Sequence, residues 1–60
     1  MKVIAVLEGY TPRYITDEAN ITQDRDLAAV FNTPYDTDRL NSFLDYIRQN
    51  FTPNVSLEVK

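Results

Sequence analysis

The sequence predicts a small α+β domain in which one helix packs on one face of an antiparallel sheet. Two observations lead to this prediction. One amphipathic helix pattern occurs, over residues 33–51, and short β-prone apolar runs lie on both sides of it. The expected order of elements is β-β-β-α-β. Because the chain has 60 residues, we expect a single domain over residues 1–60.

The first predicted strand covers residues 1–8 and is apolar on both faces. A strand of this type is central in its sheet, and the small side chain of Ala5 suits the face on which a helix lies close. Ile4 and Val6 point to the other face. Two interpretations of that face remain open: a loop covers it through Ile21, or a partner protein binds it.

A turn and a second strand follow. Gly9 permits positive φ and Pro12 lacks a ladder donor, which is typical of a turn over residues 9–12. Residues 13–16 are β-prone and are expected to pair back on the first strand as a hairpin.

The middle of the chain is polar. We interpret residues 17–26 as a loop anchored by Ile21, with a single helical turn possible over residues 24–29. A short third strand is expected at residues 28–31, one of whose last two side chains enters the core.

The helix has clear start and stop signals. Residues 33–36 have the form Thr-x-x-Asp, so Thr33 is the expected N-cap and Pro34 the first helical residue. Asn50 suits a left-handed cap, and Pro53 prevents continuation. The apolar stripe expected to face the sheet consists of Leu40, Phe43, Leu44, Ile47 and Phe51.

The last strand is predicted from a simple alternation. Val55, Leu57 and Val59 alternate with polar residues up to Lys60. This pattern is typical of a half-buried strand with one apolar face.

Charge is unevenly placed along the chain. The formal net charge is −3, but residues 17–38 carry six acids and one arginine, a net of −5. The acids are Asp17, Glu18, Asp24, Asp26, Asp36 and Asp38. This asymmetry bears on partners and solubility: the segment is either simply solvated or a patch that binds a basic surface.

The residue types present exclude most catalytic designs. Without histidine or cysteine there is no imidazole base, no thiolate nucleophile and no usual zinc site. Counting from Asp24, a calcium loop needs glycine and glutamate where the chain has Ala29 and Tyr35. We therefore expect no enzyme: no catalytic residue, no cofactor and no metal site.

Direct binding to nucleic acid or membrane is not expected either. The six basic residues are scattered and form no stripe for phosphates. The longest apolar run, Val3–Leu7, is too short to span a bilayer, so we expect a cytoplasmic protein. Tyr10, in the first turn, is the best candidate for an exposed aromatic anchor at a protein interface.

Several short motifs form one layout over nearly the whole chain. They are Tyr-Ile-Thr-Asp at residues 14–17, Thr-x-Asp…Ala-x-Val-Phe at 22–31, Thr-x-x-Asp at 33–36 and Pro-Asn-Val at 53–55. The layout resembles small proteins of bacteriophages and mobile elements. In size and charge the chain is similar to the compact acidic anti-CRISPR proteins found there. That resemblance implies a non-catalytic inhibitor that binds a CRISPR-Cas effector protein in the bacterial host cell.

The binding hypothesis has two forms. CRISPR effectors hold nucleic acid in positively charged channels, which the acids named above could occupy as a nucleic-acid mimic, with Tyr10 as an anchor. An inhibitor that binds another protein surface is the second form. The alternative class is a small self-associating regulatory or accessory module, a homodimer rather than a monomer, docking through Ile4, Val6 and Tyr14.

Overall fold

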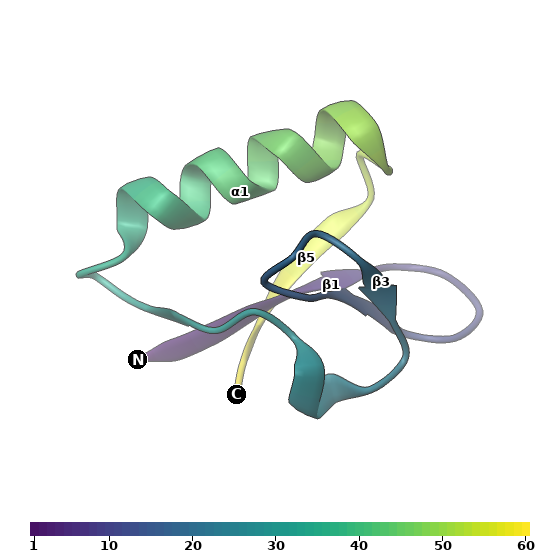
Figure 1. Ribbon diagram of the computed structural model, residues 1–60, viewed down its shortest axis with the longest axis horizontal. Helices are drawn as coiled ribbons and strands as arrows, with labels where there is room; N and C mark the ends of the chain where they lie inside the picture. The colour runs from purple at the N-terminus through teal and green to yellow at the C-terminus, as the bar shows by residue number, and fades with distance from the viewer.

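The computed structural model describes all 60 residues and shows an α+β fold (Figure 1). One helix lies over one face of a five-stranded antiparallel sheet. The elements are β1 (Lys2–Leu7), β2 (Arg13–Ile15), β3 (Ile21–Thr22), the 3₁₀ turn η1 (Arg25–Leu27), β4 (Phe31–Asn32), α1 (Thr37–Asn50) and β5 (Val55–Val59). The predicted fold class is therefore confirmed, with one more short strand than expected.

Strand β1 lies at the centre of the sheet and pairs with three others. Along one edge it pairs with β5, in a register that sets Ala5 opposite Leu57. Along its other edge it pairs with β2 near Leu7 and with β4 near Val3. Strand β3 extends this side by pairing with β2. The central position that its two apolar faces predict for β1 is confirmed.

The larger core fills the space between α1 and the sheet. Leu40, Leu44 and Ile47 of the helix pack against the odd-numbered residues of β1, among them the predicted Ala5. Phe31 of β4 joins them, so the predicted entry of this segment into the core is confirmed. Each fully buried large side chain of this kind contributes roughly 1.5–3 kcal/mol, which makes this interface the main source of stability.

A second, smaller core covers the opposite face of β1. Ile4 is fully buried there, and Val6 is buried beside it. They pack with Tyr14, Ala28 and the half-buried Val30, which belong to β2 and to the segment after η1. The short teal turn below the sheet in Figure 1 leads into this segment.

The way in which this face is covered corrects two expectations. Ile21 does not anchor a covering loop, because it is 45% exposed and pairs with Ile15 as part of β3. Nor is Ile4, Val6 or Tyr14 available to dock a partner, since all three are buried within the chain. The expected single helical turn is present as η1, whose following residues supply the cover.

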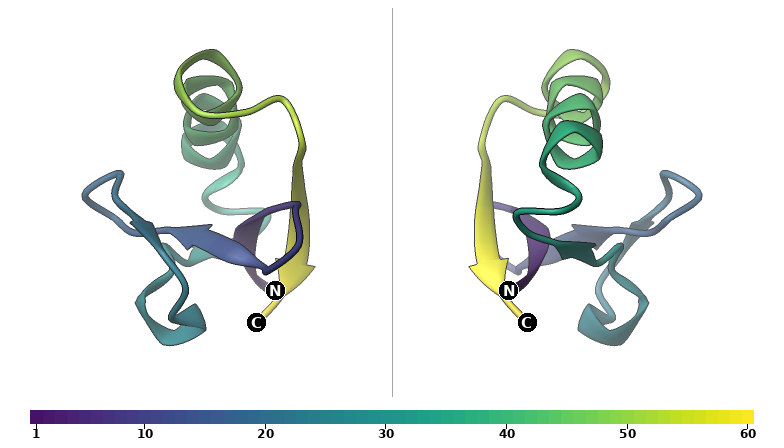
Figure 2. Two further views of the ribbon diagram at one scale, coloured as in Figure 1. Left: turned by 90° about the vertical axis from the view of Figure 1, so that its right-hand side faces the viewer. Right: turned by 90° about the vertical axis from the view of Figure 1, so that its left-hand side faces the viewer.

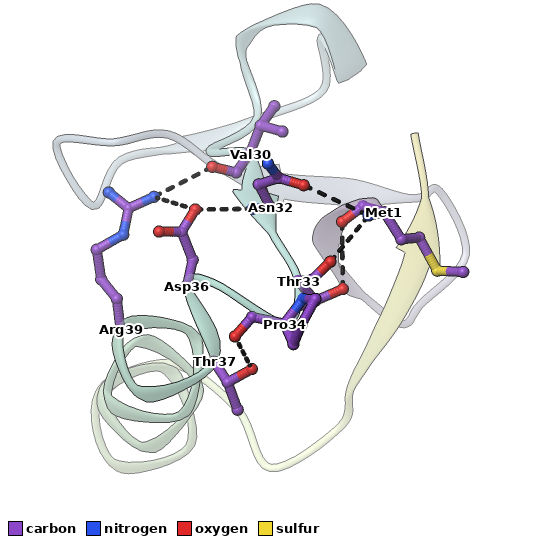
Figure 3. Close-up of polar contacts among 8 residues, drawn as sticks. All are labelled: Met1, Val30, Asn32, Thr33, Pro34, Asp36, Thr37 and Arg39. Atoms are coloured by element: carbon purple, nitrogen blue, oxygen red, sulfur yellow. Dashed lines mark hydrogen bonds and ion pairs between the residues drawn. The ribbon is translucent and has the colours of Figure 1, made fainter.

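The helix starts later than the capping pattern predicts. Its N-cap is Asp36 and its first residue is Thr37, whereas Thr33 and Pro34 lie in a turn before it, joined by a cis peptide bond. The backbone N–H and the hydroxyl of Thr33 both donate to the Met1 carbonyl, at 2.8 and 3.2 Å (Figure 3). Because Thr33 is bound to the edge of β1, its hydroxyl does not cap the helix.

The end of the helix also differs from the prediction. Asn50 is still helical, and no residue near it has a positive φ, so no left-handed residue closes the helix. The backbone N–H groups of Phe51 and Thr52 both donate to the Ile47 carbonyl. Phe51 is 38% exposed and packs edge-on against Tyr46 rather than entering the core.

Strand β5 forms where the alternation predicts it, but it is less buried than expected. Val55 is half-buried, whereas Leu57 is 45% and Val59 60% exposed. Their partners Ala5 and Val3 are buried on the helix side of β1. The views in Figure 2 show the reason: α1 lies over the middle of the sheet, and β5 stands at its side.

Replacing Ile47 should remove much of the fold's stability. Its side chain is fully buried in the larger core, so Ile47→Ala is expected to cost about 2–5 kcal/mol. A domain of 60 residues has only roughly 3–9 kcal/mol in total. Thermal unfolding followed by circular dichroism measures the loss. The exposed Gln49→Ala on the same helix is the control, and equal melting curves for the two variants would contradict the core assignment.

Candidate functional site

The six acidic residues that the sequence singles out lie in three separate places. They are Asp17 and Glu18 in the turn between β2 and β3, Asp24 and Asp26 at η1, and Asp36 and Asp38 at the start of α1. The helix lies over one face of the sheet, and η1 lies below the other (Figure 1). The fold therefore does not gather all six carboxylates on one side of the molecule.

Two of the six carboxylates are used inside the fold. Asp24 caps η1, where its carboxylate accepts a hydrogen bond from the Asp26 backbone N–H at 2.9 Å. Asp36 accepts from the Asn32 backbone N–H at 2.8 Å and lies 3.7 Å from the guanidinium of Arg39 (Figure 3). The contacts of Asp36 hold β4 against the first turn of the helix, while that of Asp24 closes the start of η1, so both acids have a structural role.

The other four carboxylates are free. Asp17, Glu18, Asp26 and Asp38 are exposed, and none of their side chains makes a hydrogen bond or ion pair within the chain. A free, hydrated carboxylate can accept hydrogen bonds from lysine or arginine side chains of a partner without losing an internal contact. Asp17 and Glu18 are adjacent in one turn, which makes this turn the strongest candidate among the three places.

The turn that carries Asp17 and Glu18 has a defined structure. The Thr16 N–H donates to the Asn20 carbonyl at 2.9 Å, and the Ala19 N–H donates to the Thr16 carbonyl at 3.0 Å. The Thr16 hydroxyl oxygen also accepts from the Asn20 N–H at 3.1 Å. We call residues 16–20 the acidic turn. Its hydrogen bonds hold the backbone of both acids while their side chains extend into solvent.

Two shallow hollows adjoin the acidic turn, and Asp17 lines both of them. The first, of about 320 Å³, is lined by Asp17, Ala29, Phe31, Arg39, Ser42 and Phe43. The second is lined by Thr16, Asp17, Glu18, Asn20 and Leu27. Both are open to solvent, so they can receive side chains of a protein partner but do not enclose a small molecule.

Arg39 is the member of this region that sequence reasoning missed. Its guanidinium donates to the Val30 carbonyl at 3.2 Å and lies 4.6 Å above the ring of Phe31, next to the carboxylate of Asp36. The helical pattern indicates only that Arg39 is on the outer face of α1. Nothing in the sequence shows that the backbone of β4 runs past that face.

Tyr10 lies away from the acids. It is fully exposed in the connection between β1 and β2, the loop at the right of Figure 1. Its exposure agrees with an anchor role, but the fold does not place it in the acidic turn or at its hollows.

The chain has neither a cluster of metal ligands nor a membrane-spanning helix. No group of three or more acidic side chains is arranged to hold a metal ion. The one helix, α1, lacks the length and apolar character needed to cross a bilayer.

Comparison with known protein families, with characterised proteins and with solved structures finds no match.

Asp36 and Asp38 allow a matched test of which carboxylates are structural. Asp36→Ala removes the acceptor of the Asn32 N–H and the partner of Arg39, and it should lower the free energy of unfolding by about 1–2 kcal/mol. Asp38→Ala removes only a favourable charge in the first turn, worth about 0.5 kcal/mol. Urea unfolding measures both variants. If Asp38→Ala cost as much as Asp36→Ala, the assigned roles would be wrong.

Ala19 provides a test of the acidic turn itself. Its φ of 63° is left-handed, a conformation that costs alanine about 1–2 kcal/mol more than glycine. Ala19→Gly should therefore raise the free energy of unfolding by up to about 1 kcal/mol, after the greater entropy of unfolded glycine is subtracted. Ala28→Gly, at a φ of −63°, should lower it instead. Urea denaturation that shows the same sign for both would contradict this backbone geometry.

Proposed function

We propose that the protein is a non-catalytic binding protein that contacts a basic surface of a partner protein through the acidic turn. The observation that carries the proposal is the pair of adjacent exposed carboxylates, Asp17 and Glu18, which have no internal partner on a hydrogen-bonded turn. Because hydrogen bonds already fix the backbone of this turn, it loses little conformational freedom on binding, which favours affinity.

The two hollows also favour binding of a partner at the acidic turn. Each hollow is lined by Asp17 and by at least one apolar side chain, such as Phe43 in one and Leu27 in the other. Lysine and arginine side chains have apolar stems and charged tips. Such a side chain of a partner can lay its stem in a hollow while its charge meets Asp17.

The partner class that fits this chemistry is a protein that holds nucleic acid in a positively charged channel. Because the chain resembles small acidic anti-CRISPR proteins, the specific partner proposed is a CRISPR-Cas effector in the cytoplasm of a bacterial host. The inhibitor acts by covering part of the effector's nucleic-acid-binding surface. Electrostatic steering would speed the encounter at low ionic strength.

A charge-matched pair of double variants tests the proposal. Asp17→Lys/Glu18→Lys reverses both charges of the acidic turn, whereas Glu8→Lys/Asp45→Lys makes the same change in net charge at exposed acids elsewhere. The measurement is displacement of a labelled target DNA from purified CRISPR effector complexes, by fluorescence anisotropy at several salt concentrations. The turn variant should bind at least about tenfold more weakly at low salt and lose most of the salt dependence.

The control variant should keep most of the wild-type affinity. Equal loss in both variants would show a general charge effect rather than a site. An absence of DNA displacement from every effector tested would contradict the choice of partner, while binding to the effector without displacement would contradict the inhibitory mechanism.

A further inference from the structure

The outer edge of β5 is the longest free strand edge in the fold. Strand β5 has five residues and pairs with β1 alone, whereas the edge strands on the other side of the sheet, β3 and β4, have two residues each. Both views in Figure 2 show β5 as the outermost element on its side, with no other segment beyond it. A two-residue edge is too short to template pairing, but a five-residue edge is not.

The backbone groups that face outward are known from the ladder with β1. At its two ends, the Glu8 N–H donates to the Asn54 carbonyl at 3.0 Å, and the Lys60 N–H donates to the Lys2 carbonyl at 2.8 Å. Even-numbered residues on β5 therefore bond to β1. Because antiparallel strands alternate, Val55, Leu57 and Val59 direct their N–H and C=O groups away from β1.

Two of these six outward groups have partners within the chain. The Val55 N–H donates to the Pro53 carbonyl at 3.1 Å. The Val59 carbonyl accepts from the guanidinium of Arg25 at 2.9 Å. The Val55 carbonyl, both groups of Leu57 and the Val59 N–H remain without a hydrogen-bond partner in the chain, which gives two donors and two acceptors on one edge.

We propose that this edge binds a second copy of the chain, with the two β5 strands antiparallel about a two-fold axis at Leu57. In this register, each Leu57 N–H donates to the Leu57 carbonyl of the other copy. Each Val59 N–H donates to the opposite Val55 carbonyl. The four groups that are free in one copy thus pair with the four that are free in the other. The two outward groups that this register does not pair, the Val55 N–H and the Val59 carbonyl, are already bonded to Pro53 and Arg25.

The side chains fit the same register. On the helix face, Leu57 meets Leu57 of the second copy, and Val59 meets Val55, so the exposed apolar area of β5 is covered. On the other face, Glu58 lies opposite Ser56, and its own charge is offset by Arg25 at 4.0 Å. No like charges lie directly opposite each other in the pairing.

The dimer is a separate property from binding through the acidic turn. None of the four free carboxylates lies on β5, so each surface can be altered without the other. Sedimentation equilibrium measures the dimer directly. The wild-type chain should show twice the chain mass at micromolar concentrations, and Leu57→Lys should be monomeric because it sets two cations against each other across the two-fold axis.

Leu27→Lys is the matched control, since Leu27 is 58% exposed but lies on η1. It should stay dimeric, and circular dichroism should show that both variants keep the fold. A wild-type chain that is monomeric up to millimolar concentrations would overturn the proposal. Such a result would leave β5 as an edge for a strand of another protein.

Cysteine substitutions test the register, and the chain has no cysteine of its own to interfere. Residues opposite each other in a hydrogen-bonded pair have Cα atoms about 5.5 Å apart, within the range of a disulfide. Leu57→Cys should therefore form a covalent dimer rapidly in a glutathione redox buffer, well ahead of Ser56→Cys or Leu27→Cys. A mixture of Ser56→Cys and Glu58→Cys should form the mixed dimer. Cross-linking of Leu57→Cys no faster than of Leu27→Cys would overturn the pairing.

Discussion

Burial of β1 on both of its faces is the constraint on which the rest of the fold depends. A strand of six residues with apolar side chains on each face needs cover above and below, and the chain has one helix for the purpose. Helix α1 covers the side of Ala5, and the segment after η1 covers the side of Ile4. Each remaining strand then takes its place by pairing with β1 or, as β3 does, with a strand that pairs with it.

The same constraint decides where the exposed surface lies. Because α1 lies over the middle of the sheet, the outer strand β5 keeps part of its apolar side chains in solvent. Because the chain between β2 and β4 must cross to the far side of the sheet, its acids are distributed along that path. The acidic turn is the part of the path that returns from β2 to β3, and its hydrogen bonds to Thr16 hold it there.

The sequence was informative where periodicity is strong and local. The two faces of β1, the helical stripe at Leu40, Leu44 and Ile47, and the position of β5 all follow from it. The helix start was missed because Thr33 is held by the Met1 carbonyl, a contact between residues far apart in sequence. Strand β3 was missed because it has only two residues, too few to show an alternation of apolar and polar side chains. Whether Asp17 and Glu18 form ion pairs within the chain depends on which arginines lie near them, and only the fold determines this.

The position of acids on both faces of the sheet has a consequence for the shape of any partner. A flat surface that meets the acidic turn cannot also meet the carboxylates at η1 and those at the start of α1, since these lie on opposite sides. A partner that engages all three must be concave and enclose the molecule, as a channel does. The steepness with which affinity falls as salt is added depends on how many of these carboxylates are paired with the partner. This slope would therefore distinguish a concave partner surface from a flat one, without a structure of the complex.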